Sequence, residues 1–246
     1  PSRGLGDVYK RQILNGDDDK LRGYSPENGI TPVYFGLDES CGFHAENISG
    51  KGLNGTDAQF FTPNSSFTAH INIPGAHMVY NALAATAVGY ALGMTDREIC
   101  AGIEANVPIA GRNNLIRAPH FTIIDDCYNA NPVSTKAALD LLSLADGRKV
   151  AVLGDMFELG EKERELHGQV GAYVAEKGID CLYCAGNLSK EMYRAAKEAG
   201  IDCVEHFADT DALLAALPGL LQPGDSVLIK ASHGMGYAKI VEALEK

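Results

Sequence analysis

The chain has 246 residues, of which 46% are hydrophobic and 22% charged, and its formal net charge is −11. This length and hydrophobic content suffice for one large domain or two small ones with a buried core, so we expect a globular protein. The acidic balance argues against nucleic-acid binding, which needs clustered Lys and Arg. The sequence contains no run of 18 apolar residues, so we expect no membrane insertion.

Six cysteines are scattered along the sequence, and the only close pair is Cys181 and Cys184. That pair lies in an apolar stretch typical of a buried strand, without the second pair that a zinc site needs. We interpret the cysteines as core thiols, with redox or metal use of the pair as the alternative. Free thiols favour the cytoplasm, which is the compartment that we expect.

Residues 1–12 show no apolar periodicity, and we interpret them as a leader outside the fold, either non-native or disordered. The sequence then opens on Ile13-Leu14-Asn15, which is typical of a strand running into a polar turn. A domain seldom begins in this way, so we expect its amino-terminal part to be missing from the chain.

Residues 23–73 are rich in glycine and contain short strand-like segments. Two of these segments are Val33–Phe35 and Phe67–Ile71. A helix of small residues is predicted from about Val79 to Leu92, and Gly93 ends it. A second helix begins at Thr95, because Thr95 and Glu98 have the spacing of a capping box.

Beyond Arg112 the sequence alternates regularly between strands and helices. The predicted strands are Phe121–Ile124, Val150–Leu153, Cys181–Cys184, Cys203–His206 and Ser226–Ile229. The predicted helices are Ser134–Leu144, Glu163–Lys177, Ser189–Glu198, Asp211–Leu217 and Ala238–Leu244. Leu115–Ala118 is a candidate antiparallel edge strand. This pattern predicts an α/β domain with a doubly wound, mostly parallel sheet, separated from the preceding domain near Gly111–Arg112.

Polar side chains cluster where the first of these strands ends, in Asp125-Asp126-Cys127-Tyr128-Asn129-Ala130-Asn131-Pro132. Ligands of open α/β sheets bind at the carboxyl ends of strands, near helix amino termini. There Asp can bind ribose hydroxyls, Tyr can stack on a base and Asn can orient polar atoms. The alternative is a capped turn, which accounts for Asn131 and Pro132 but not for Asp125, Asp126 and Tyr128 together.

A second polar pair, His77 and Asn81, lies four residues apart, so both side chains share one face of the predicted helix near its amino terminus. Such a pair can hydrogen-bond a nucleotide. The alternative is a helix cap followed by a closely packed alanine helix.

These segments resemble the Mur ligase family, and within it the branch that adds D-alanyl-D-alanine. The resemblance runs from about Ile13 to Lys246. The motifs that carry it are Pro74-Gly75-x-His77-x-x-x-Asn81-Ala82-Leu83-Ala84-Ala85, Arg112 after Pro108-Ile109-Ala110-Gly111, the Asp125–Pro132 segment, Leu153-Gly154-Asp155-Met156-x-Glu158-Leu159-Gly160-Glu161, His167, and Lys230-x-Ser232.

The resemblance implies the carboxy-terminal part of the central ATP-binding domain over residues 13–111 and a Rossmann-like carboxy-terminal domain over 112–246. It implies ATP and Mg²⁺ as cofactors, with UDP-N-acetylmuramoyl-tripeptide and D-alanyl-D-alanine as substrates, joined through an acyl phosphate in peptidoglycan precursor synthesis. We further expect a monomer. The implied nucleotide contacts are His77, Asn81, Arg112, Asp126 and Tyr128. The implied catalytic residues are Arg112 and Lys230, and the implied dipeptide contacts are Asn129, Asn131 and Ser134.

Some features depart from the family pattern. Met78 stands where the family has Asn, and Ala231 and His233 stand where Gly and Arg are usual. The sequence contains no G-x-x-x-x-G-K-[ST], so we expect no ligase activity from this chain alone and no metal ligands within it. A ligase for another amino acid, or a non-catalytic nucleotide-binding scaffold, is the alternative.

Asp126 occupies the end of a predicted strand. We therefore expect its side chain to pack little, so that its replacement impairs nucleotide use and spares the fold.

Overall fold

The computed structural model describes residues 11–24, 30–75, 77–108 and 111–246, and these divide into two compact units after Val107. Each unit has its own cluster of buried hydrophobic residues. The domain boundary predicted at Gly111–Arg112 lies just after this division. Of the predicted leader, residues 1–10 lie outside the described part, whereas the Gln12 carbonyl oxygen accepts a 2.8 Å hydrogen bond from Val33 N.

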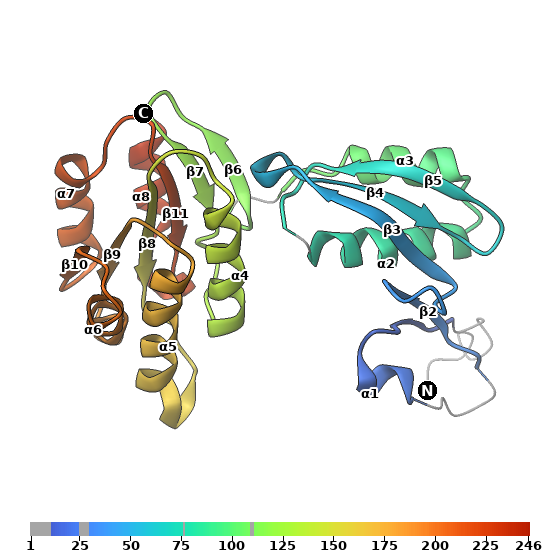
Figure 1. Ribbon diagram of the computed structural model, residues 1–246, viewed down its shortest axis with the longest axis horizontal. Coiled ribbons are helices and arrows are strands. Elements are labelled where there is room, and N and C mark those ends of the chain that lie inside the picture. The colour runs from blue at the N-terminus through green and yellow to red at the C-terminus, as the bar shows by residue number, and fades with distance from the viewer. Residues whose placement is uncertain (1–10, 25–29, 76, 109–110) are drawn as a thin grey trace, which may run out of the picture. The chain divides into compact units, whose positions relative to one another are not determined.

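The first unit is a five-stranded sheet of order β1-β2-β3-β4-β5, packed against helices (Figure 1). β1, β2 and β3 pair in parallel, and β3, β4 and β5 pair antiparallel. The elements are β1 (Ile13–Asn15), α1 (Asp19–Arg22), β2 (Val33–Gly36), β3 (Phe43–Gly50), η2 (Gly52–Asn54), β4 (Thr56–Phe61), β5 (Ser66–Ile71), α2 (His77–Ala91) and α3 (Asp96–Glu104).

The antiparallel pair β3–β4 is absent from the sequence-based prediction, which correctly places β2, β5 and α2. On β3 the alternation of buried and exposed residues is confined to Phe43 through Glu46, and residues 47–50 are all exposed. Two inward positions of the pair are the small residues Ala45 and Ala58. So short and weak an apolar pattern does not stand out in a glycine-rich stretch.

Both helix boundaries predicted in this unit are confirmed. Gly93, with φ of +81°, follows α2 in the left-handed conformation that glycine adopts most readily. Thr95 caps α3 through a capping box with Glu98.

The second unit is a six-stranded sheet of order β10-β9-β8-β11-β7-β6, parallel throughout except for the antiparallel edge strand β6. The elements are β6 (Asn114–Arg117), β7 (Thr122–Asp125), α4 (Pro132–Ser143), β8 (Lys149–Gly154), η3 (Gly160–Lys162), α5 (Glu163–Glu176), β9 (Cys181–Ala185), α6 (Lys190–Glu198), β10 (Cys203–Phe207), α7 (Thr210–Leu220), β11 (Ser226–Lys230), η4 (His233–Met235) and α8 (Ala238–Leu244).

All predicted strands and helices of the second unit are confirmed, with bounds within about two residues of the prediction except at the end of one helix. α7 continues past Leu217 through Pro218 to Leu220. A proline in the last turn removes one backbone hydrogen bond, but Leu221 N still donates to the Leu217 carbonyl oxygen at 3.0 Å. The helix therefore ends one turn later than the proline suggests.

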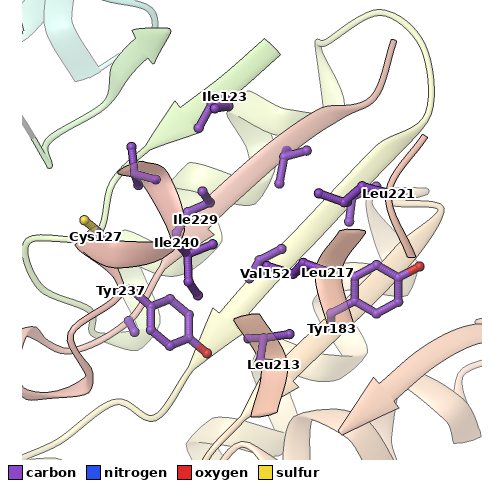
Figure 2. Packing of buried hydrophobic residues seen from close by; sticks show 14 of the residues in the cluster. Ile123, Cys127, Val152, Tyr183, Leu213, Leu217, Leu221, Ile229, Tyr237 and Ile240 are labelled. Carbon is purple, nitrogen blue, oxygen red and sulfur yellow. The ribbon is translucent and has the colours of Figure 1, made fainter. Parts of the chain in front are cut away.

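Helices cover both faces of this sheet. Figure 2 shows the cluster in which alternate strand residues such as Val152 and Ile229 pack against Leu213 and Leu217 of α7 and Ile240 of α8. The intervening strand residues, such as Leu153 and Leu228, are equally buried. On that other side α5 contacts both α4 and α6, α4 contacts β8 and β11, and α6 contacts β9 and β10. The sheet is therefore doubly wound, as predicted.

We expect residues 113–246 to form a protease-resistant core, because their sheet is covered on both faces and an ordinary domain has this size. Limited proteolysis of the whole chain, followed by mass spectrometry, should leave this segment intact while residues 13–110 are cleaved. A stable core derived from the first unit, or uniform digestion of the chain, would contradict this expectation.

Candidate functional site

The topology of the second unit makes the carboxyl end of β11 the expected ligand site. β11 lies between β7 and β8. α8, which follows β11, packs on the face that carries α7, whereas α4 and α5, which follow β7 and β8, contact each other on the other face. Connections that leave toward opposite faces open a crevice at the strand ends, where α/β proteins bind ligands. The segments 126–131, 155–160 and 231–236 meet at this edge.

Lys230, the last residue of β11, is buried, with a side chain only 2% exposed. Its ammonium group donates to Asp126 Oδ2 at 2.5 Å and to the Asn129 carbonyl oxygen at 2.8 Å, with a longer contact of 3.4 Å to the Asp126 carbonyl oxygen. A lysine ammonium has three donors. All of them are directed to the 126–129 loop, which favours a role for Lys230 in positioning that loop.

The expectation that Asp126 packs little is wrong. The residue is only 9% exposed, and Lys230 and Asn113 both bind its carboxylate, the latter through a 3.1 Å hydrogen bond from its backbone N. The neighbouring strand β11 extends far enough to place Lys230 over the end of β7. The sequence of β7 alone does not reveal this contact. We therefore expect replacement of Asp126 to destabilise the fold as well, and its contact with ribose stays a prediction.

Arg112 and His233 both contact the ring of Tyr128 at the same edge. The guanidinium carbon of Arg112 lies 4.1 Å from the centroid of the Tyr128 ring, and the His233 ring lies 5.7 Å from it in a tilted arrangement. Tyr128 is 49% exposed, and Arg112 and His233 are exposed too. An aromatic ring can stack on a base and a guanidinium can bind phosphate, so these three residues suit a nucleotide.

Gly111 holds Arg112 beside Tyr128. Gly111 N donates to Asp125 Oδ2 at 2.8 Å, and its carbonyl oxygen accepts from Tyr128 N at 3.0 Å. Its φ is +78°, a conformation that strains other residues. The remaining Asp125 oxygen accepts from Cys127 N at 3.3 Å. Burial, together with the Asp125 carboxylate, raises the pKa of Cys127 to about 12, so this thiol stays neutral.

The residues predicted to face the dipeptide are partly engaged in the turn. Asn131 Oδ1 accepts from Ser134 N at 2.8 Å, and Ser134 Oγ accepts from Asn131 N at 3.1 Å. This is a capping box at the start of α4, with Pro132 in the first turn as predicted. Asn129 is exposed, and its side-chain oxygen accepts from Ala130 N at 2.9 Å. Their contact with substrate stays a prediction.

A pocket of about 460 Å³ opens beside Tyr128, a size that suits a small ligand. Its lining includes Gly111, Asn114, Ile116, Asp125, Cys127, Tyr128, His233, Gly236, Tyr237, Ala238, Val241, Glu242 and Glu245. The prediction from sequence lacks Asn114, Glu242 and Glu245 as wall residues. The signal that could have found the two glutamates is their spacing of three residues, with Glu242 on the helix after β11 and Glu245 at its C-cap.

His77 and Asn81 belong to the first unit, where both lie exposed on the amino-terminal part of α2, as predicted. Asn81 lines a pocket of about 500 Å³ between α2 and α3. Met78, which replaces the expected asparagine, is buried, and its sulfur accepts a 3.3 Å hydrogen bond from Asn81 Nδ2. The proline–glycine motif before α2 includes Ala76, and the motif before Arg112 includes residues 109–110, which lie outside the described residues.

Within the described ranges no group of three or more His, Cys, Asp and Glu side chains is arranged to hold a metal ion. The same part of the chain contains no helix with the length and apolar character to cross a membrane. All six cysteines are free.

The sequence is similar to proteins named UDP-N-acetylmuramoyl-tripeptide–D-alanyl-D-alanine ligase. Those of Escherichia coli and Bacillus subtilis are each 35% identical over 196 residues, which is 78% of this chain and 42% and 41% of theirs. The chain thus spans less than half the length of these relatives. A crystal structure of MurF from Acinetobacter baumannii, 28% identical, matches 97% of this chain and 53% of its own with a TM-score of 0.87.

A MurF ligase of Thermotoga maritima in complex with ADP shares the fold, with a TM-score of 0.77 at 24% identity over 96% of this chain and 53% of its own. Two family models match the sequence directly. Residues 6–89 match the Mur ligase middle domain, and residues 111–233 match the glutamate ligase domain of Mur ligases. The second match alone covers half of the chain, and the chain belongs to the Mur ligase family.

Proposed function

We propose that this chain forms part of an ATP-dependent ligase that joins D-alanyl-D-alanine to UDP-N-acetylmuramoyl-tripeptide in peptidoglycan precursor synthesis. Relatives of that name share 35% identity with it. The observation that carries the proposal is the meeting of Arg112, Asp126, Tyr128 and Lys230, all residues of the family motifs, at the switch point of the second sheet.

The proposed reaction has two steps. A carboxylate oxygen of the tripeptide attacks the γ-phosphorus of ATP, and ADP leaves, which gives an acyl phosphate. The amine nitrogen of the dipeptide then attacks the acyl carbon, a C–N bond forms, inorganic phosphate leaves and the amine loses a proton. Charge on the transferred phosphoryl group must be neutralised throughout.

The roles of this chain's residues follow from that charge. Arg112 presents a permanent cation beside Tyr128, where the guanidinium can bind a phosphate while the ring contacts the base. Lys230 and Asp126 hold the 126–129 loop, which carries Tyr128. Mg²⁺ would neutralise phosphate charge when bound, but the described residues contain no cluster that fits it, and no step here depends on it.

Nucleotide binding tests the proposal. We expect ADP to bind the 246-residue chain in isothermal titration calorimetry and Arg112→Met to weaken binding about tenfold to a hundredfold, because charge-assisted hydrogen bonds contribute about 1.5–3 kcal/mol. Tyr128→Ala should weaken it over a similar range.

Lys197→Met is the matched control, because Lys197 lies 5.5 Å over the ring of Tyr193 in the same kind of contact on α6. That variant should bind ADP like the parent chain. Unchanged affinity in both Arg112→Met and Tyr128→Ala, or no binding of ADP by the parent, would rule out this nucleotide site.

A further inference from the structure

Phe157 is an exposed aromatic residue at the carboxyl end of β8, with 43% of its surface accessible. Much of this apolar side chain is therefore available to a ligand. Beside it, Glu158 has a φ of +62°, a conformation that is rare for residues other than glycine and that often marks functional loops. The loop is therefore held in one particular conformation with the ring at the surface.

Buried polar side chains hold the backbone around Phe157. Phe157 N donates to Ser232 Oγ at 2.8 Å, and Met156 N donates to His167 Nε2 at 2.9 Å. His167, which is fully buried, has its other ring nitrogen 2.6 Å from the Glu163 carbonyl oxygen, so it is neutral in this arrangement, with the proton on Nδ1. Ser232 and His167 thus fix two successive residues of the loop.

Asp155 connects this loop to its neighbours. Its buried carboxylate accepts hydrogen bonds from Asn187 N, Leu188 N and Ser189 N at 2.9, 3.0 and 2.7 Å. Its carbonyl oxygen accepts from Ser232 N at 3.0 Å. Hydrogen bonds therefore join the loops that follow β8, β9 and β11 at the carboxyl edge of the sheet. Such an arrangement is typical of a site that is organised before its ligand binds.

The loop after β11 contacts both Phe157 and Tyr128. A Cβ atom on Gly234 would lie 3.2 Å from Phe157 Cε2, so the ring packs over this glycine. The preceding residue, His233, contacts the Tyr128 ring. The edge therefore runs from Arg112 and Tyr128 through His233 and Gly234 to Phe157.

We propose that Phe157, packed over Gly234, is the apolar contact for the methyl groups of the incoming D-alanyl-D-alanine. The inference rests on the proposed function. Arg112 and Tyr128 are the proposed nucleotide contacts, and we place the attacking amine on the adjoining part of the edge, where His233 contacts Tyr128 and Gly234 contacts Phe157. The methyl groups are the apolar part of this dipeptide, and Phe157 offers an apolar surface for them there.

The test is an NMR titration of the whole 246-residue chain with D-alanyl-D-alanine and, separately, with glycylglycine, which lacks both methyl groups. We expect chemical-shift changes at Phe157 and Gly234 on addition of D-alanyl-D-alanine. The Kd should be lower for D-alanyl-D-alanine than for glycylglycine, by about fourfold for each methyl group that Phe157 covers. Phe157→Ala should bring the two dissociation constants together, whereas Phe157→Leu should keep most of the difference.

The control variant is Leu144→Ala, since Leu144 is also an exposed apolar residue, at 59%, but follows the far end of α4. It should bind both dipeptides like the parent chain. Unchanged selectivity in Phe157→Ala, or no dipeptide binding by the parent, overturns the inference. Chemical-shift changes at Phe157 on titration with UDP-N-acetylmuramoyl-tripeptide instead of the dipeptide also overturn it. The ADP titration separates the two proposals, because ADP binding without dipeptide binding leaves the proposed function intact.

Discussion

Replacing Lys230 by methionine should lower the free energy of unfolding of the second unit by about 3–5 kcal/mol. The substitution leaves the Asp126 carboxylate without its ammonium partner in a site where the two side chains are only 12% and 2% exposed. It also releases the Asn129 carbonyl oxygen. Urea unfolding of the whole chain, followed by circular dichroism, should show an earlier transition for the second unit.

Two further variants make this result specific. Adding Asp126→Asn to Lys230→Met should recover part of the loss, because a neutral amide is less costly to bury than an unpaired carboxylate. Lys239→Met is the matched control. It breaks a lysine–aspartate pair whose side chains are 41% and 84% exposed, and such pairs contribute at most about 1 kcal/mol. Equal effects of Lys230→Met and Lys239→Met would show that the pair of Lys230 and Asp126 is not a buried structural contact.

The 246-residue chain alone should show no ATP-dependent joining of D-alanyl-D-alanine to UDP-N-acetylmuramoyl-tripeptide. Phosphoryl transfer depends on positioning and charge neutralisation, and the sequence contains no G-x-x-x-x-G-K-[ST] loop to supply them. The loss should therefore be close to total. Phosphate release and mass spectrometry of the nucleotide-linked product are the measurements.

The Escherichia coli relative serves as the positive control in the same assay. Nucleotide binding by the 246-residue chain should persist, since Arg112 and Tyr128 remain in place. Product formation by the purified chain at a rate within a few orders of magnitude of the relative would contradict the expectation.

Local chemistry made much of the fold predictable. Asn131 and Pro132 carry the signals of a helix start, and the structure shows the capping box. Strands such as Val150–Leu153 are continuous apolar runs because both faces of the parallel sheet are covered. The hairpin of β3 and β4 escaped prediction because half of β3 is exposed and the inward Ala45 and Ala58 interrupt the pattern of large apolar residues.

The candidate site was predictable only in part. The sequence by itself determined that Asp126, Tyr128 and their neighbours follow a strand, since hydrophobic periodicity and caps act between residues close in the chain. Only the tertiary structure decided that Lys230 pairs with Asp126, across a separation of 104 residues, and that Phe157 lies over Gly234. Those contacts depend on the order of β7, β11 and β8 in the sheet, and strand order is set by the packing of the whole domain.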